Sequence, residues 1–218
     1  LVPVRDCERQ GHNETAHRLV QLCGQIMRYA IATGRAKHNM AADLKDALKP
    51  VQTKHMASIT ESKKVGSLLR TIDAYEGHFP IQCALRIAPY VFLRPGELRQ
   101  GEWTEIDFEN GEWRIPAHKM KMRQLHIVPL SQQVQNVLAE LKPFTGHCKY
   151  LFPSTRTQDR PISDVTLLAA LRRMGYDTKT EITGHGFRAM ARTILHEELN
   201  QKPEVIEHQL AHKVPDAL

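Results

Sequence analysis

Two arginines, a lysine and two histidines have the types and spacing that could act on a phosphate group, and the first of them is Arg94. It stands in the motif Leu-Arg-Pro-Gly-Glu-Leu-Arg at residues 93–99. Because Pro95 suits the first position of a helix, Arg94 is predicted at the helix mouth, beside oriented N–H groups that favour an anion. The other interpretation is an Arg94–Glu97 surface ion pair that closes a turn. The motif alone leaves both open.

A basic turn at residues 117–123, Ala-His-Lys-Met-Lys-Met-Arg, supplies the lysine. It carries Lys119, Lys121 and Arg123 and no acidic residue, so it could reach into a DNA groove or toward a scissile phosphate. A solvated basic turn is the alternative interpretation. Alternate residues on a strand share a face, so Lys119 would point the same way as Lys121. Lys119 therefore remains a possible substitute for Lys121 as the lysine that reaches the phosphate.

The histidines lie in the motifs Gly-His-Gly-Phe-Arg at 184–188 and Gln-Leu-Ala-His-Lys at 209–213. His185 and Arg188 are three residues apart and would share a helical face, which Arg192 extends by one turn. His212 would end an amphipathic segment. The alternatives are a capping His185 with an exposed Arg188, and a His212 that only caps or packs against its helix end.

These motifs are carried by a chain that is predicted to be mainly α with a small three-stranded antiparallel sheet. Asn110-Gly111 predicts a two-residue hairpin turn between strands near 106–108 and 113–115, and a third alternating run covers 125–130. Apolar periodicity predicts the helices. They are expected at 15–33, from about 60 to 72, at 80–93 with a break near Pro89, and at 131–142, 163–174, 186–199 and 203–211.

Several side chains are expected inside these helices. Thr15 is the predicted N-cap of the first helix and Gly34 its C-cap. Tyr29 and Tyr90 are expected in the core, as is Phe187. The predicted inward-facing stripes consist of Leu19, Leu22, Ile26, Met27 and Ala30 in the first helix and Val205, Ile206 and Leu210 in the last.

Composition favours a polyanion as partner. The 218 residues include 30 Lys+Arg against 24 Asp+Glu, a formal net charge of +6, which suits nucleic acid. The four cysteines form no Cys-X-X-Cys pair and there is no long apolar run, so a cytoplasmic protein is expected. Aromatic residues make up only 6%, which argues against a base-stacking surface for single strands.

Taken in order, the four motifs resemble the catalytic series of the tyrosine recombinases. The stretches LRPGELRQGEWTEIDFENGEWRIPAHKMKMRQLHIVPLS and GHGFRAMARTILHEE are similar to integrases of satellite-type prophages and genomic islands. The resemblance identifies residues 53–218 as the catalytic domain, truncated before its nucleophile. Residues 1–52 resemble the C-terminal part of the helical core-binding, DNA-binding domain and its linker.

The resemblance implies a role for each residue. Arg94 and Arg188 would clamp the phosphate, Lys121 would act as general acid, and Glu97 would support Arg94. His185 and His212 would donate hydrogen bonds to the phosphate or help to move the tyrosine proton. DNA-binding roles would fall to Lys119, Arg123 and Arg192. No metal and no cofactor is expected, because the arginines replace the cation that phosphoryl transfer often uses.

The tyrosine nucleophile of this family is expected just after Leu218, and none of the five tyrosines follows His212. Because the chain also begins at Leu1, it is expected to be a piece of a longer protein that binds DNA but does not cleave it. The resemblance implies three kinds of partner: double-stranded attachment-site DNA, other protomers in a synaptic tetramer, and DNA-bending or directionality factors. It also implies a bacterial, nucleoid-associated location in the cytoplasm.

Three other classes of protein remain as alternatives. A DNA-binding protein without catalysis or a decayed integrase would share the charge and the helices. A metal-dependent nuclease could use some of the 12 histidines, but no His-Glu-X-X-His motif is present. A purely structural or interaction protein would show salt-insensitive DNA binding or none at all.

Overall fold

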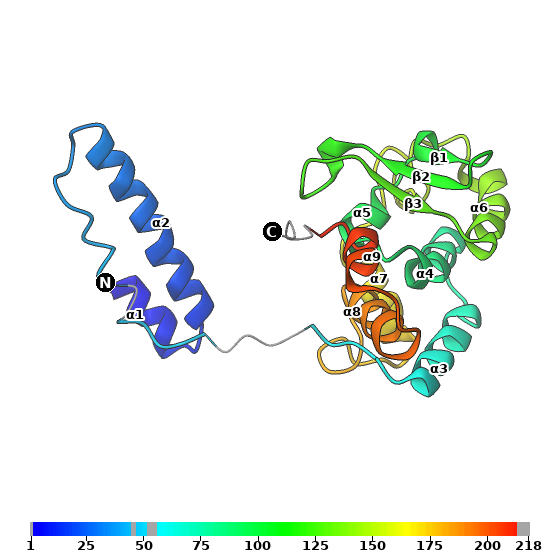
Figure 1. The fold of residues 1–218 in the computed structure, drawn as a ribbon, viewed down its shortest axis with the longest axis horizontal. Coiled ribbons are helices and arrows are strands. Elements are labelled where there is room, and N and C mark those ends of the chain that lie inside the picture. Colours follow the sequence, from blue (N-terminus) through cyan, green and yellow to red (C-terminus); the bar gives the residue numbers. More distant parts are fainter. Residues whose placement is uncertain (1, 45–46, 52–55, 213–218) are drawn as a thin grey trace. The chain divides into compact units, whose positions relative to one another are not determined.

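The chain divides into two compact units, Leu1–His55 and Met56–Leu218. The computed structural model describes residues 2–44, 47–51 and 56–212 (Figure 1). The boundary expected between residues 52 and 53 therefore falls outside the described residues.

The first unit is a pair of helices, α1 (Val2–Arg9) and α2 (Asn13–Ala32). Its small core contains Val4, Ala16 and Val20. Small side chains on this face of α2 let α1 approach closely. Of the apolar stripe predicted for α2, Leu19 packs against this core. The prediction is wrong for Leu22 and Ile26, which are exposed.

The ends of α2 also differ from the prediction. The helix begins at Asn13, so Thr15 lies inside its first turn and does not cap it. At the other end Thr33 is the C-cap, and Gly34 follows it at a φ of +71°. The helix thus ends one position earlier than predicted, and Gly34 lies just after the C-cap in the left-handed conformation that glycine adopts without a steric penalty.

The second unit is mainly α with a small sheet, as predicted. Its α-helices cover most of the predicted helical stretches. They are α3 (Ser62–Asp73), α4 (Phe79–Val91), α5 (Pro95–Arg99), α6 (Gln132–Thr145), α7 (Thr166–Arg173), α8 (Gly186–Thr193) and α9 (Pro203–Gln209). Short 3-10 turns lie at η1 (Trp103–Glu105) and η2 (Ala117–Lys119), and a π-helical turn forms η3 (Ile194–Glu198).

Helix α4 is the centre of this unit. It contacts α3, α6, α7 and α8, and most of its side chains are buried. The predicted break at Pro89 is wrong, because the helix continues to Val91 and ends at Phe92, which has a φ of 53°. We attribute the continuity to the burial of apolar side chains around Pro89, which offsets the backbone hydrogen bond that a proline cannot donate.

The sheet has the predicted strand number and order. Strands β1 (Ile106–Asp107), β2 (Glu112–Ile115) and β3 (His126–Pro129) pair antiparallel in the order β1-β2-β3. The predicted two-residue turn is wrong, because Asp107 pairs with Glu112 and leaves a four-residue loop. Asn110 donates from its backbone N–H and its side chain to the Asp107 carboxylate, which closes this longer loop.

The final helices position the motif residues. The stretch predicted as one helix is α8 followed by the π-helical turn η3. In α9, Ile206 and the C-cap residue Leu210 are buried as predicted, but Val205 is exposed. Phe187 is buried at the start of α8, as expected.

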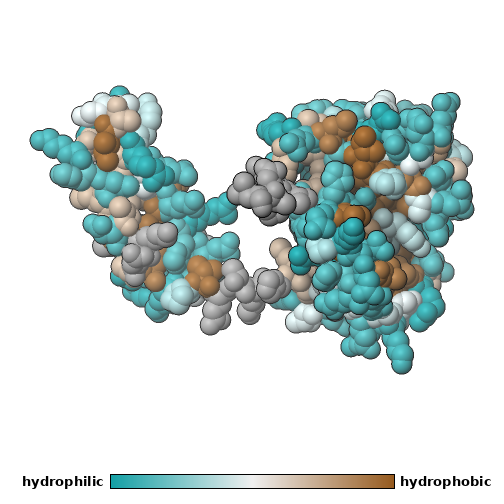
Figure 2. Space-filling view, in the orientation of Figure 1, coloured by the Kyte–Doolittle hydropathy of each residue, from teal (hydrophilic) through white to brown (hydrophobic). Residues whose placement is uncertain are grey.

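The surfaces of both units are mainly hydrophilic, with scattered apolar patches (Figure 2). Tyr29 is 65% exposed and Tyr90 41% exposed, so their prediction as core residues is wrong. Within the described part of the chain, no helix is long and apolar enough to span a membrane.

Candidate functional site

Arg94 lies at the mouth of α5, as predicted, with Pro95 in the first position of the helix. The Glu97 carboxylate accepts hydrogen bonds from the Arg94 backbone N–H at 2.9 Å and from its Nη1 at 2.8 Å. Both interpretations of the motif therefore apply, but Glu97 is buried and the pair is no surface contact. Glu97 uses one guanidinium nitrogen and leaves the other donors of the fork for an anion.

Arg188 lies in the first turn of α8 and is only 8% exposed. Its guanidinium donates to the carbonyl oxygens of Phe92 and, at 2.5 Å, of Leu210. These carbonyls lie at the C-terminal ends of α4 and α9, where a cation is favoured by the helix dipoles. Burial, together with the charge of Arg94, lowers the pKa of Arg188 to about 10, so it is a cation at neutral pH. The alternative of an exposed arginine is wrong.

His212 is turned back toward Arg188 by the end of α9. The His212 N–H donates to the Glu207 carbonyl and the Ala211 N–H to the His208 carbonyl, with Ala211 at a φ of 50°. These are the two hydrogen bonds of a Schellman motif. The loop after α9 is therefore defined by backbone contacts.

The protonation of His212 follows from its partners. Arg188 Nη2 lies 3.0 Å from His212 Nε2, and a guanidinium can only donate, so Nε2 is the acceptor. The proton is then on Nδ1, which lies 2.5 Å from Glu207 Oε2 and donates to it. Glu207 thereby selects the tautomer, as a carboxylate beside a histidine often does.

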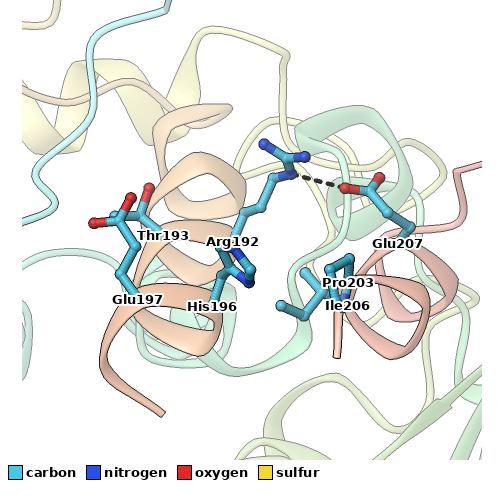
Figure 3. Close-up of a pocket in the computed structure, with 7 residues that line it drawn as sticks. All are labelled: Arg192, Thr193, His196, Glu197, Pro203, Ile206 and Glu207. Carbon is cyan, nitrogen blue, oxygen red and sulfur yellow. Dashed lines mark hydrogen bonds and ion pairs between the residues drawn. The ribbon is translucent and has the colours of Figure 1, made fainter. Parts of the chain in front are cut away.

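Arg192 extends this arrangement outward. Its Nε donates to Glu207 Oε1 at 2.7 Å, and its hydrogen bond, followed by that of His212, holds the pKa of Glu207 below its usual value. Figure 3 shows this pair beside a small pocket of about 90 Å³ between the α8–η3 segment and α9. Arg192 is therefore paired, with most of its side chain still open to solvent.

His185 is the N-cap residue of α8 and is exposed. Partial desolvation and then the positive charges of Arg188 and Arg94 lower its pKa below the usual 6.5. His185 is therefore neutral at physiological pH, a form that can accept a proton. The same charges place His185, Arg94 and Arg188 within electrostatic reach of one another.

The basic turn separates its two lysines. Lys119 ends the 3-10 helix η2, and its ammonium contacts Glu102, Glu105 and the Gln100 carbonyl. Lys121 lies in the following turn, is exposed, and has no hydrogen bond to a described residue. The expectation that the two lysines share a strand face is wrong, because the backbone here is helical and then turns. Arg123, also exposed, closes the turn at a φ of 55°.

Two residues of this region were missed by sequence reasoning. Glu207 lies in α9 and orients His212, and its only sequence signal is its position five residues before this histidine. His126 is buried in β3 with no partner for its Nε2 among the described residues. Burial, opposed by the charge of Glu97, lowers the pKa of His126.

One cluster therefore joins most of the predicted site residues. Contacts or electrostatic coupling link five of them, namely Arg94, Glu97, His185, Arg188 and His212. Lys121 lies on the β2–β3 turn, which extends past the end of the sheet (Figure 1). Within the described part of the chain, no three His, Cys, Asp or Glu side chains converge on a metal position. Two guanidiniums with a neutral imidazole beside them can bind a phosphodiester and exchange protons with it.

Models of known protein families match both units. The model described as the phage integrase family matches residues 58–216, and the model of the phage integrase central domain matches residues 1–47. Among curated proteins, the integrase of Enterobacteria phage P4 is 38% identical over 224 residues, covering 97% of this chain and 51% of the relative. Prophage integrase IntS of Escherichia coli K12 is 34% identical over 213 residues, covering 97% and 54%. The chain thus spans about half the length of these relatives.

Solved structures share the fold. A lambda integrase tetramer bound to a Holliday junction aligns with a TM-score of 0.71 at 18% identity, covering 99% of this chain and 63% of that chain. The Tn1549 transposon integrase in complex with a circular intermediate DNA aligns with a TM-score of 0.76 at 13% identity, covering 96% and 75%. At this level of identity the likeness concerns the backbone arrangement.

Proposed function

Because the chain belongs to the phage integrase family, we propose that it is the phosphate-binding part of a site-specific DNA recombinase that cleaves and rejoins strands. The observation that carries the proposal is the cluster around Arg188. There His212 contacts Arg188, and Arg94 and His185 lie within electrostatic reach of it. The activity would integrate or excise a mobile element.

The chemistry is a transfer of the phosphoryl group from one oxygen to another. A tyrosine oxygen attacks the phosphorus, the bond from phosphorus to the 5′-oxygen breaks, and a 3′-phosphotyrosine forms. The leaving 5′-oxygen takes a proton from the Lys121 ammonium. Attack on the phosphotyrosine by a partner strand's 5′-hydroxyl reverses the step and reseals the DNA. The bond energy is kept in the covalent link, so no cofactor is consumed.

The cluster stabilises the charge that develops in this reaction. Arg94 and Arg188 donate to the non-bridging oxygens, an electrostatic contribution worth about 3 kcal/mol for each donor in comparable sites. Neutral His185 suits the acceptor of the tyrosine proton. His212 accepts from Arg188 through Nε2, so it orients that guanidinium and donates to the phosphate only after the contact changes.

The nucleophile is proposed on the segment that follows Leu218. Residues 213–218 lie outside the described part of the chain, and the tyrosines within the described residues lie in other parts of the fold. We further propose that residues 1–52 are part of the core-binding domain on DNA and residues 53–218 the catalytic domain. Double-stranded attachment sites and other protomers in a tetramer are the proposed partners, in keeping with the relatives solved on DNA.

The test uses the complete gene product and a nicked suicide substrate that traps the covalent intermediate. We expect a protein–DNA adduct to form in the presence of a metal chelator. Arg94→Ala should slow it about 10²–10³-fold, with DNA binding largely kept. Arg94→Lys keeps a cation beside Glu97 but loses the fork, so it should also be slow. Arg114→Ala, an exposed arginine on β2, is the matched control. Binding without any adduct from the unmodified protein would instead favour a non-catalytic DNA-binding protein.

A further inference from the structure

Lys119 lies just before the turn that carries Lys121, the proposed general acid. Its Nζ lies 2.6 Å from Glu102 Oε1 and 3.0 Å from the Gln100 carbonyl oxygen, and it also contacts Glu105 Oε1. An ammonium has three donors, and each has an acceptor here. The side chain is 13% exposed. Lys119 can therefore contact DNA only by giving up one of these partners.

The carboxylates that hold Lys119 are themselves fixed to the sheet. Glu105 Oε2 accepts from the indole N–H of Trp113 at 3.0 Å and from the Glu102 backbone N–H at 3.1 Å. Trp113 is fully buried in β2. The Lys119 ammonium thus belongs to a hydrogen-bond network that extends through Glu105 to the buried indole of Trp113. Moving the ammonium would break hydrogen bonds in this network.

The same ammonium connects the two sides of the site. Gln100 is the C-cap of α5, the five-residue helix whose N-cap is Arg94. Lys119 is two residues before Lys121 in the chain, and buried Met120 lies between them. A single buried cation therefore fixes the start of the Lys121 turn relative to the helix that carries the first phosphate-binding arginine.

We infer that Lys119 is a positioning residue that acts through Lys121, with Glu102 and Glu105 as its anchor. The inference rests on the proposed function, since it takes Lys121 to be the general acid. Neither a DNA contact nor proton donation is then the role of Lys119. Burial lowers the pKa of Lys119, but the hydrogen bonds that its ammonium donates to Glu102 and Glu105 outweigh this effect and raise the pKa overall. A tightly held ammonium of this kind is a poor proton donor.

The loss of Lys119 would displace the turn for an electrostatic reason. Glu102 and Glu105 would be left as two neighbouring, largely buried carboxylates. Among the residues that the structure describes, the cation still paired with them would be Lys149, which is 61% exposed and 3.5 Å from Glu102. Repulsion between the carboxylates, or their protonation, would change the conformation at residues 117–120. Lys121 would then lie away from the leaving oxygen.

The experiment compares two suicide substrates in the complete gene product. One has the natural bridging 5′-oxygen at the scissile phosphate, and the other has sulfur in its place. A thiol has a pKa near 8.5 and leaves as the thiolate, so the sulfur substrate needs no general acid. Lys121→Ala should form adduct slowly on the oxygen substrate and at near the unmodified rate on the sulfur substrate. Arg94→Ala should form adduct slowly on both substrates.

Lys119→Met is expected to follow Lys121→Ala. Adduct formation on oxygen should slow about 10–100-fold, as expected for a misplaced catalytic group, and the sulfur substrate should restore it to near the unmodified rate. Glu102→Gln, which keeps the Lys119–Glu105 pair, should show a smaller defect that sulfur also restores. Lys149→Met removes the exposed lysine from the same carboxylate and should behave as the unmodified protein on both substrates.

The possible outcomes separate this inference from the proposed function. If the unmodified protein forms no adduct, both are overturned. If it forms adduct and Lys119→Met cleaves oxygen at the normal rate, only the positioning role is lost. If Lys119→Met and Glu102→Gln are slowed equally on both substrates, the network stabilises the fold and does not position Lys121, which overturns the inference. A normal oxygen rate for Lys121→Ala would make Lys119 itself the acid, which also overturns the inference.

Discussion

The phosphate-binding cluster and the β2–β3 turn contribute to the same proposed reaction, yet they are held in opposite ways. Arg188 is buried and donates to the ends of two helices and to His212. Lys121 is exposed, with no hydrogen bond to a described residue. The cluster is preorganised by the fold itself, whereas the turn is held ahead of Lys121 by the Lys119 contacts and by buried Met120 and leaves Lys121 itself exposed.

This difference matches the chemistry that each region would perform. Charge stabilisation requires donors that are already oriented, since reorganising them during the reaction would cost free energy. A general acid needs only to reach one leaving oxygen, and its position can be completed when DNA binds. The comparison predicts that substitutions in the cluster reduce both stability and cleavage, whereas substitution of exposed Lys121 reduces cleavage alone.

The largest expected contrast is between Arg188→Met and Lys121→Met. Arg188→Met leaves the Phe92 and Leu210 carbonyls without their donor, and each lost charged hydrogen bond is worth about 1.5–3 kcal/mol. We expect the free energy of unfolding to fall by about 3 kcal/mol and adduct formation to be abolished. Lys121→Met should leave the urea midpoint unchanged and slow cleavage about 10²–10⁴-fold. Equal stability losses for the two variants would break the comparison.

A smaller effect is expected where the cluster meets solvent, at Glu207. Glu207→Gln keeps one acceptor oxygen, so it can hold Arg192 or His212 but not both. The tautomer of His212 is then no longer fixed, and the loss of one charged hydrogen bond predicts a rate of adduct formation about 10-fold to 100-fold lower. Glu204→Gln, an exposed glutamate in the first turn of α9, is the matched control. Single-turnover kinetics on the suicide substrate would measure both, and an unchanged rate for Glu207→Gln would remove the carboxylate from the site.

Local sequence patterns predicted the helices and strands better than they predicted which residues contact one another. The sequence motif around Arg94 predicted its place at the mouth of α5, because proline at the first helical position is a local preference. Alternating apolar residues likewise predicted three strands. The hairpin loop was longer than predicted, since the Asp107 contacts to Asn110 outweigh the preference of Asn-Gly for a two-residue turn.

What the sequence did not predict depends on contacts between distant residues. The Lys119 anchor joins residues 100, 102 and 105 to residue 119, and no periodicity records such a contact. Tyr29, Leu22 and Ile26 are exposed in the first unit because its core is small and centres on Val4, Ala16 and Val20. Apolar spacing shows that a helix has an apolar side, but it does not show which neighbour covers that side.

The smallest expected effect concerns the backbone that holds His212. Ala211 adopts a φ of 50° at the end of α9, a conformation that costs a residue with a Cβ atom about 1 kcal/mol. Ala211→Gly removes this cost and should raise the free energy of unfolding by about 0.5–1 kcal/mol. The Schellman hydrogen bonds do not involve the side chain, so cleavage should be unchanged.

Ala189→Gly, at an exposed position inside α8, is the control. It makes the same substitution at a helical φ and should instead lower stability by about 0.5–1 kcal/mol. Thermal unfolding of the two variants would show whether each substitution raises or lowers the free energy of unfolding. A loss of stability in both would mean that the end of α9 is not held as the Arg188 and His212 contacts require.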